Sequence, residues 1–294
     1  MTTLGKFHAL RLAFAVTVST LAVGTGCHGG PATVMTELSE ANRLAADLRV
    51  QFNQAADASN RAVMAETDEA SIAFASEAQQ TGAAVDRDVA AIGPLLHSVG
   101  LPNESQLLEQ FGERLAAYRS VDRTVLALAV ENTNLKAQRL SFGAARSAAD
   151  RFKADLVLAP AIQAKDRCRG EALVNQAVLA VRELQTVQGP HIASPDEAAM
   201  TSIEQQMATL EGSTASALAA LSGLVEPSAL AAAQADFAEF KSVGSQIVTL
   251  SRRNSNVRSL DLSLRVKPPL TAACDDTLRA LERALASEGS KATR

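Results

Sequence analysis

Three arginines form the first set of side chains in this chain that could do chemistry. Arg61, Arg119 and Arg123 lie in stretches whose apolar residues recur with a helical spacing. A guanidinium group binds a carboxylate through two parallel hydrogen bonds, so the three side chains could hold a small anionic ligand. The alternative is that they belong to solvated charged helix faces, which is the ordinary place for arginine.

Two pairs of asparagines form the second set. Asn132 and Asn134 recur 122 residues later as Asn254 and Asn256. Asparagine is a poor helix former because its amide competes for backbone hydrogen bonds. One interpretation is that the four amides bind a small polar ligand or fix the register of neighbouring helices. The favoured interpretation is that positions two apart point to different faces, so that one asparagine is exposed and one marks a loosened turn near a helix end.

The N-terminus has the pattern of an export signal. Lys6 and Arg11 precede an apolar stretch, Leu12 to Val23, which is too short for an ordinary membrane span, and a small residue then precedes Cys27. This pattern predicts that residues 1–26 are a signal peptide and that Cys27 is lipidated, which would anchor the chain to a bacterial membrane on the periplasmic side of the cell envelope. The alternatives are a secreted soluble protein and a retained signal anchor.

The other two cysteines, Cys168 and Cys274, form an even pair in an oxidising compartment, which suggests a disulfide. The expected helices place them at opposite ends of one antiparallel unit, about 20 Å or more apart, whereas a disulfide joins Cα atoms within about 7 Å. Cys274 also aligns with Phe152, an expected core position. We therefore expect Cys274 to be a small buried thiol.

Enzyme and metal signatures are missing from the sequence. The histidines are isolated, and the sequence contains no HExxH, CxxC or CxxCH motif. No nucleophile, base and orienting group can be assembled from the residues present. We therefore expect no catalytic residues, no metal and no cofactor. The histidines are His8, His28, His97 and His191.

Composition favours a helical fold and a protein partner or small ligand over nucleic acid. Loss of Lys6 and Arg11 with the signal changes the formal net charge from −4 to −6, which argues against nucleic-acid binding. Aromatic residues make up only 3% of the chain, with one tyrosine and no tryptophan. A core of alanine and leucine suits closely packed helices, so the predicted fold class is all-α.

The chain repeats itself. The segments Ser120-Val121, Asn132-Thr133-Asn134 and Leu140-Ser141 recur at one offset of 122 residues, and Thr67 to Ala70 match Pro195 to Ala198 at an offset of 128. The two offsets differ by six residues, so the second copy is six residues shorter between these segments. A length change confined to a turn is typical of two copies of one helical unit.

The apolar spacing and the turn residues predict the helices of each unit. Thr67 or Asp68 is expected to cap one helix, and Ser194 is expected to cap another whose first helical residue is Pro195. The first unit is expected to contain helices near 34–66, 68–98, 104–140 and 143–166, and the second near 161–188, 195–223, 228–264 and 270–287. Short turns make neighbouring helices antiparallel. The predicted architecture is therefore two tandem up-down-up-down four-helix bundles placed end to end, the first over 27–165 and the second over 166–294, with a bend at Pro160.

Several short segments resemble the four-helix-bundle sensor module of methyl-accepting chemotaxis receptors. These are Asn60 to Ala65, the helix start at Asp68-Glu69, Phe111 to Tyr118, and Val125 to Leu128 followed by Asn132 and Asn134. The resemblance covers roughly residues 40–165 and, more weakly, 170–287. It implies an extracytoplasmic bundle that senses a ligand or partner and often dimerises. The chain departs from the receptor pattern by lacking a second membrane span and a cytoplasmic signalling coiled coil.

Two functions remain open at this point. The favoured one is a lipid-anchored sensory or binding module that acts through a small polar or anionic ligand, or through a separate membrane receptor partner, in signal transduction. The alternative is a structural spacer or scaffold of the cell envelope, because long alanine-rich helices suit coiled-coil association. A sensor needs a pocket between helices with polar side chains facing inward, whereas a spacer needs a continuous dry core.

Overall fold

The structure is a computed structural model that describes residues 31–157, 162 and 164–292. Every regular element in these residues is helical, which confirms the all-α prediction. The predicted signal peptide, Cys27 and the predicted bend at Pro160 lie outside the described residues. Among the described helices, none is both long enough and apolar enough to cross a bilayer.

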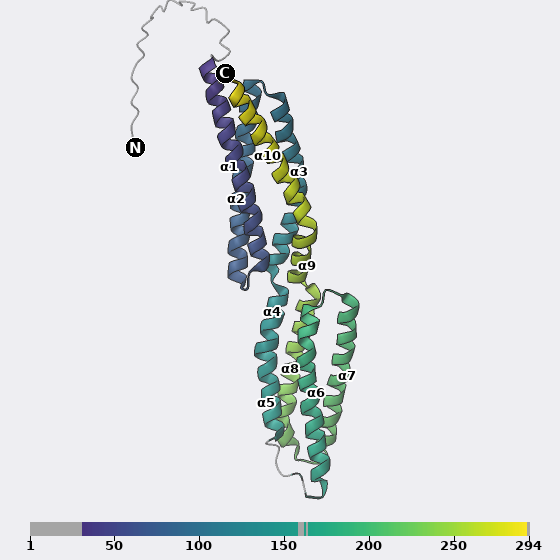
Figure 1. Cartoon of the computed structure of the whole chain (residues 1–294). Helices are drawn as coiled ribbons and strands as arrows, with labels where there is room; N and C mark the ends of the chain where they lie inside the picture. The colour runs from purple at the N-terminus through teal and green to yellow at the C-terminus, as the bar shows by residue number, and fades with distance from the viewer. Residues whose placement is uncertain (1–30, 158–161, 163, 293–294) are drawn as a thin grey trace, which may run out of the picture.

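The helices pack in two groups that lie end to end (Figure 1). The terminal group consists of α1 (Pro31–Met64), α2 (Asp68–Val99), α3 (Pro102–Glu131) and α10 (Lys267–Ala292). The central group consists of α4 (Thr133–Leu140), α5 (Arg146–Val157), α6 (Arg167–Ala193), α7 (Glu197–Leu221) and α8 (Pro227–Arg253). The start of α1 and the end of α10 lie together at the outer end of the terminal group.

Short irregular elements link several of the helices. Two π-helical turns, Ser141–Ala145 and Leu262–Val266, join α4 to α5 and α9 (Ser255–Asp261) to α10. A 3-10 turn at Ala164–Asp166 precedes α6. The two π-helical turns fall at nearly equivalent positions of the sequence repeat, so the repeat extends to these local irregularities of the backbone.

The caps of the helices follow from the sequence. The Thr67 side chain accepts a hydrogen bond from the amide of Ala70 at the start of α2, as predicted, and Gly100 ends that helix with a positive φ of 78°. The start of α7 differs from the prediction of a Ser194 cap followed by a helical proline. Asp196 is the cap instead, because its carboxylate accepts from the amides of Ala198 and Ala199.

Each group has its own apolar core. In the terminal group the ring of Phe52 meets those of Phe111 and Tyr118 edge to face, with centroids 6.0 and 5.2 Å apart. In the central group Phe152 packs against Phe237 with a centroid separation of 5.7 Å. The core of the terminal group also contains four fully buried residues of α10, namely Cys274, Leu278, Leu281 and Leu285.

The predicted tandem order is wrong in the placement of two helices. Helix α10 packs on α1 and α3 of the terminal group, and α5 packs on α8 and α6 of the central group. The turn expected after residue 140 does not form. Instead α3 continues through α4 into α5, and α8 continues through α9 into α10, so each of these two long paths crosses from one group to the other. The groups therefore do not correspond to residues 27–165 and 166–294.

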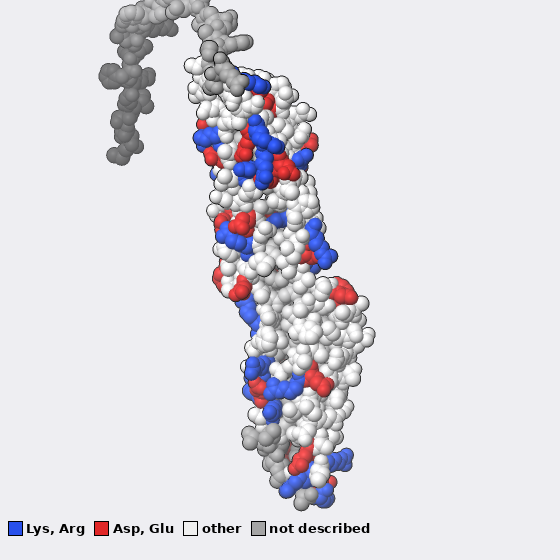
Figure 2. Space-filling view, viewed as in Figure 1, with Lys and Arg blue, Asp and Glu red and all other residues white. Residues whose placement is uncertain are grey.

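Charged side chains are distributed over both groups. On the face shown in Figure 2, basic and acidic residues lie interspersed rather than gathered by sign. Many form ion pairs between neighbouring helices, such as Arg151 with Asp236 at 2.8 Å and Arg253 with Glu131 at 2.6 Å. Such a face offers no extended field of one sign to a charged partner.

Cys168 and Cys274 are both free thiols, and they lie in different groups rather than at opposite ends of one unit. Cys168 is exposed, whereas Cys274 is fully buried, as predicted, and burial raises the pKa of the Cys274 thiol to about 11. We expect an alkylating reagent at neutral pH to modify Cys274 more slowly than Cys168 by a factor on the order of 10³, because modification requires an opening of the core.

Mass spectrometry of peptides from a labelling time course measures the two rates separately. The control is the same labelling in enough denaturant to unfold the chain, because the reagent should then modify both thiols at similar rates. Comparable rates in the native protein would contradict the placement of α10 in the terminal core.

Candidate ligand-binding pocket

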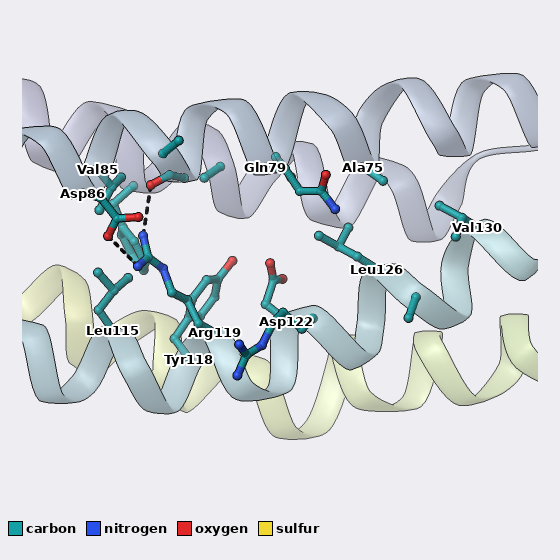
Figure 3. Close-up of a pocket in the computed structure, with 17 residues that line it drawn as sticks. Ala75, Gln79, Val85, Asp86, Leu115, Tyr118, Arg119, Asp122, Leu126 and Val130 are labelled. Carbon is teal, nitrogen blue, oxygen red and sulfur yellow. Dashed lines mark hydrogen bonds and ion pairs between the residues drawn. The ribbon is translucent and has the colours of Figure 1, made fainter.

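A pocket of about 440 Å³ lies between α2 and α3, with α1 behind it. Small residues of α2 leave this space open opposite α3, and aliphatic side chains such as Leu115 and Leu126 form the facing wall (Figure 3). The small residues are Ala75, Ala78, Gly82 and Ala83. The volume lies in the range of pockets that hold small ligands, whose linings are also mostly apolar with a few polar groups.

The Tyr118 side chain brings an unpartnered polar atom to this pocket. The residue is only 3% exposed, yet its buried hydroxyl makes no hydrogen bond. It lies beside the Asp122 carboxylate on the same helix (Figure 3). Burial raises the pKa of Tyr118, and the charge of the Asp122 carboxylate and its position as a nearby acceptor add to this effect, so the hydroxyl keeps its proton. The two groups do not, however, meet with the geometry of a hydrogen bond. A buried donor without a partner is rare and needs an explanation.

Asp122, the neighbour of the Tyr118 hydroxyl, forms an ion pair with the buried Lys267. Lys267, at the first position of α10, places its Nζ 3.0 Å from Oδ1 of Asp122 and 2.7 Å from Oγ of Ser59. Ser59 in turn donates to the same Oδ1 at 2.6 Å. Burial lowers the pKa of Lys267, and the Asp122 carboxylate opposes this effect. Ser59 and Lys267 both donate to Oδ1 of Asp122. The other oxygen, Oδ2, can therefore accept from a ligand in the pocket, which Asp122 lines.

The structure does not gather the three predicted arginines into one anion site. Arg119 and Arg123 line the pocket, but Arg119 pairs with Asp86 at 2.6 Å and donates to the carbonyl of Gly82 at 2.9 Å. Arg123 is exposed at the rim. Arg61 lies outside the pocket lining, where it pairs with acidic residues of α1 and α2, Asp57 and Glu77.

The second copy of the repeat lacks the polar cluster. At the offset of 122 residues, Tyr118 corresponds to Phe240, Asp122 to Gly244 and Lys267 to Ala145. Phe240 and Gly244 line a pocket of about 370 Å³ between α6, α7 and α8, and Ala145 is fully buried. The same backbone positions can therefore be filled without a hydroxyl, a carboxylate or an ammonium group, so the fold alone does not require them.

The predicted asparagines lie at the junction of the two groups. Asn132 and Asn254 both have positive φ values, 50° and 53°, and end α3 and α8. Asn134 and Asn256 form a reciprocal pair of hydrogen bonds: the backbone amide of each donates to the side-chain oxygen of the other at 3.1 Å. Each side-chain nitrogen also donates to the oxygen of the opposite cap, at 2.7 and 2.9 Å.

These contacts decide between the two interpretations of the asparagines. Asn132, Asn134 and Asn254 are buried and Asn256 is half-buried, so the expectation that one asparagine of each pair is exposed is wrong. The other part of the favoured interpretation is confirmed, because Asn132 and Asn254 interrupt the helices with positive φ values. Thr133 and Ser255 complete the arrangement, since the backbone amide of each donates to the other's hydroxyl oxygen at 3.0 Å. The amides fix the register of two crossing helices, as the alternative proposed. Most of their polar atoms bond within the junction, but the side-chain nitrogen of Asn132 is buried without a partner.

Sequence reasoning missed Tyr118, Asp122, Ser59 and Lys267 as a site. The available signal was the difference between the copies, because Tyr118 is the only tyrosine of the chain and its equivalent is a phenylalanine. Lys267 could not be found in this way, because it was expected to lie between two helices of the other bundle.

Replacing Tyr118 with phenylalanine should leave the chain at least as stable, and raise the free energy of unfolding by up to about 1 kcal/mol, because the substitution removes a buried unsatisfied hydroxyl and keeps the ring. Denaturant unfolding of the full chain measures this effect. Phe240→Leu, which changes the ring at the equivalent position, should lower the stability and serves as the contrasting variant. A marked loss of stability in Tyr118→Phe would mean that the hydroxyl has a partner.

Metal binding has no support in the part of the chain that the structure describes, where no three His, Cys, Asp or Glu side chains are placed to share an ion. Comparison with known proteins adds no further assignment: no protein-family model, curated protein or solved structure matches the chain.

Proposed function

We propose that this chain is an exported sensory or binding module, anchored by a lipid on Cys27, whose ligand occupies the pocket between α2 and α3 of the terminal group. One observation carries the proposal: the Tyr118 hydroxyl is buried without a partner beside Asp122 and faces an apolar pocket of about 440 Å³. A ligand that accepts from this hydroxyl would remove the cost of leaving it unsatisfied.

The two helix groups support a module that projects from a surface. We propose to regard them as two four-helix bundles that exchange their closing helices. Helix α1 has 34 residues and α6 has 27, so the two groups in line extend over roughly 90 Å at 1.5 Å per residue. Since α1 begins at the outer end of the terminal group, an anchor on Cys27 would place that group next to the membrane, close to a separate membrane partner.

A structural spacer is the second candidate, and the junction favours it. The reciprocal hydrogen bonds of Asn134 and Asn256 hold the two groups in one fixed register, which a rigid rod requires. A spacer, however, gives no reason for the polar cluster at Tyr118 and Asp122, which the equivalent positions Phe240 and Gly244 lack.

The buried cluster does not favour an enzyme. Ser59 and Lys267 lie 2.7 Å apart, a spacing that a nucleophile and its base would need. Yet the Ser59 hydroxyl donates its hydrogen bond to Asp122, and the same carboxylate is paired with Lys267. Neither group is then free to act, so we propose a binding role for this cluster.

Thermal unfolding of the full chain with a panel of small molecules tests the proposal, because a ligand that binds only the native state raises the midpoint. The panel contains amino acids, dicarboxylates, aromatic acids, amides and nucleobases. The blocking variant is Gly82→Leu, since Gly82 lines the pocket and a Cβ there has no neighbour within 4 Å. Gly112→Leu is the matched control, because Gly112 also has free space but lies outside the pocket lining.

We expect at least one class of compound to raise the midpoint of the wild type and of Gly112→Leu, but not that of Gly82→Leu. Both substitutions should themselves stabilise their helices by about 0.5–1 kcal/mol. If every compound leaves the wild type unchanged at millimolar concentration, or if the rise persists in Gly82→Leu, the spacer becomes the better account.

A further inference from the structure

We infer that the ligand of the pocket between α2 and α3 is a small neutral molecule with an apolar body and an adjacent hydrogen-bond donor and acceptor, such as an amide. This inference rests on the proposed function of the pocket. A neutral ligand replaces the anionic ligand that the three arginines suggested. The paired charges at the pocket, its free hydrogen-bonding groups and its apolar lining all favour an uncharged group.

The charges at the pocket are already balanced. Asp86 is paired with Arg119 at 2.6 Å, and Asp122 is paired with the buried Lys267 at 3.0 Å. A ligand carboxylate placed at the Tyr118 hydroxyl would lie beside the carboxylate of Asp122, and a ligand ammonium group would compete with Lys267 for it. Either charge would be taken out of water without a free partner, which costs more than the contact returns.

Arg123 does not change this balance. Its side chain is exposed at the rim and therefore remains hydrated. An ion pair at such a position contributes on the order of 0–1 kcal/mol. That is less than the repulsion that an anion deeper in the pocket would meet from Asp122.

The available hydrogen-bonding groups are one donor and one acceptor side by side. The Tyr118 hydroxyl can donate to a ligand, since it keeps its proton and makes no hydrogen bond of normal geometry within the protein. The Oδ2 atom of Asp122 can accept, because Ser59 and Lys267 both use Oδ1. An amide or lactam edge presents a carbonyl to the first group and an N–H to the second. Gln79 projects from α2 toward the same space and can add a contact from the opposite wall (Figure 3).

The rest of the lining fits an apolar ring. The ring of Phe52 and the side chains of Leu115, Leu126 and Val130 surround the space, together with the small residues of α2. Between these walls the volume of about 440 Å³ can hold a bicyclic body.

Isothermal titration of the full chain with three matched probes tests the inference. Indole-3-acetamide, indole-3-acetate and tryptamine share one apolar body and carry a neutral amide, an anion and a cation. We expect the amide to bind at least about tenfold more tightly than either charged probe, because each charged probe would bury a charge without a free partner. Tyr118→Phe should weaken amide binding about fivefold by removing one hydrogen bond, whereas Gly112→Leu should leave it unchanged.

The outcomes separate this inference from the proposed function. A charged probe that binds as tightly as the amide, and is lost in Gly82→Leu, would overturn the neutral ligand class and leave the pocket in place. An amide affinity that is unchanged in Tyr118→Phe would also overturn it. If none of the three probes binds, the inference is wrong, and the broader panel with Gly82→Leu decides separately whether the pocket binds any ligand.

Discussion

Replacing Asp122 with alanine will lower the free energy of unfolding by about 3–5 kcal/mol, because it leaves the ammonium group of Lys267 buried without a counter-charge. The side chain of Lys267 is only 3% exposed, and the only carboxylate paired with it among the described residues is that of Asp122. Chemical denaturation of the full chain, monitored by circular dichroism at neutral pH, measures the loss.

The second copy of the repeat supplies the rescue for this variant. Since Gly244 and Ala145 occupy the equivalent positions, the double variant Asp122→Ala/Lys267→Met should recover most of the lost stability. Asp86→Ala is the matched control, because it removes the same charge from an ion pair whose carboxylate is 59% exposed, and it should cost less than about 1 kcal/mol. A similar small cost for Asp122→Ala would show that Lys267 is not held in the core.

The second large effect is expected at the junction. We expect Asn134→Ala to lower the free energy of unfolding by about 3 kcal/mol, because the amide of Asn134 donates to the carbonyl of Ile192 and to Asn254, both at 2.7 Å, and its oxygen accepts from the backbone of Asn256. The substitution leaves these buried groups without partners, and each such group costs about 1–3 kcal/mol before relaxation.

Denaturant unfolding of Asn134→Ala is compared with that of Asn175→Ala, which changes an exposed asparagine of α6. The control should change stability by less than about 0.5 kcal/mol. Equal effects of the two substitutions would contradict the register contacts between the two long helical paths.

Local features of the fold were predictable from the sequence because they depend on neighbouring residues. The cap at Thr67, the prolines that begin α3 and α8, and the buried stripe that contains Phe111 and Tyr118 all follow from short patterns. The repeat also identified the asparagines, and the offset of 122 residues is the separation of several contacts across the junction.

The connection between the two groups was not predictable in the same way. Both copies of the repeat carry a similar apolar helix face. The apolar face of α10, which contains Leu278 and Leu281, would therefore fit the core of either group. Only the continuous passage of α8 through α9 into α10 determines which core receives it. The candidate site depended on this choice, because Lys267 reaches Asp122 only when α10 closes the terminal group.

The most direct test of the ligand pocket uses Tyr118 itself, since it is the only tyrosine of the chain. With ring-¹³C-tyrosine incorporated into the full chain, NMR gives one ring signal set, which reports on the pocket alone. We predict that a compound that raises the unfolding midpoint will shift this signal set saturably in the wild type and in Gly112→Leu, but not in Gly82→Leu. An unchanged tyrosine signal at ligand concentrations that raise the midpoint would show that binding occurs elsewhere and would contradict the assignment of this pocket.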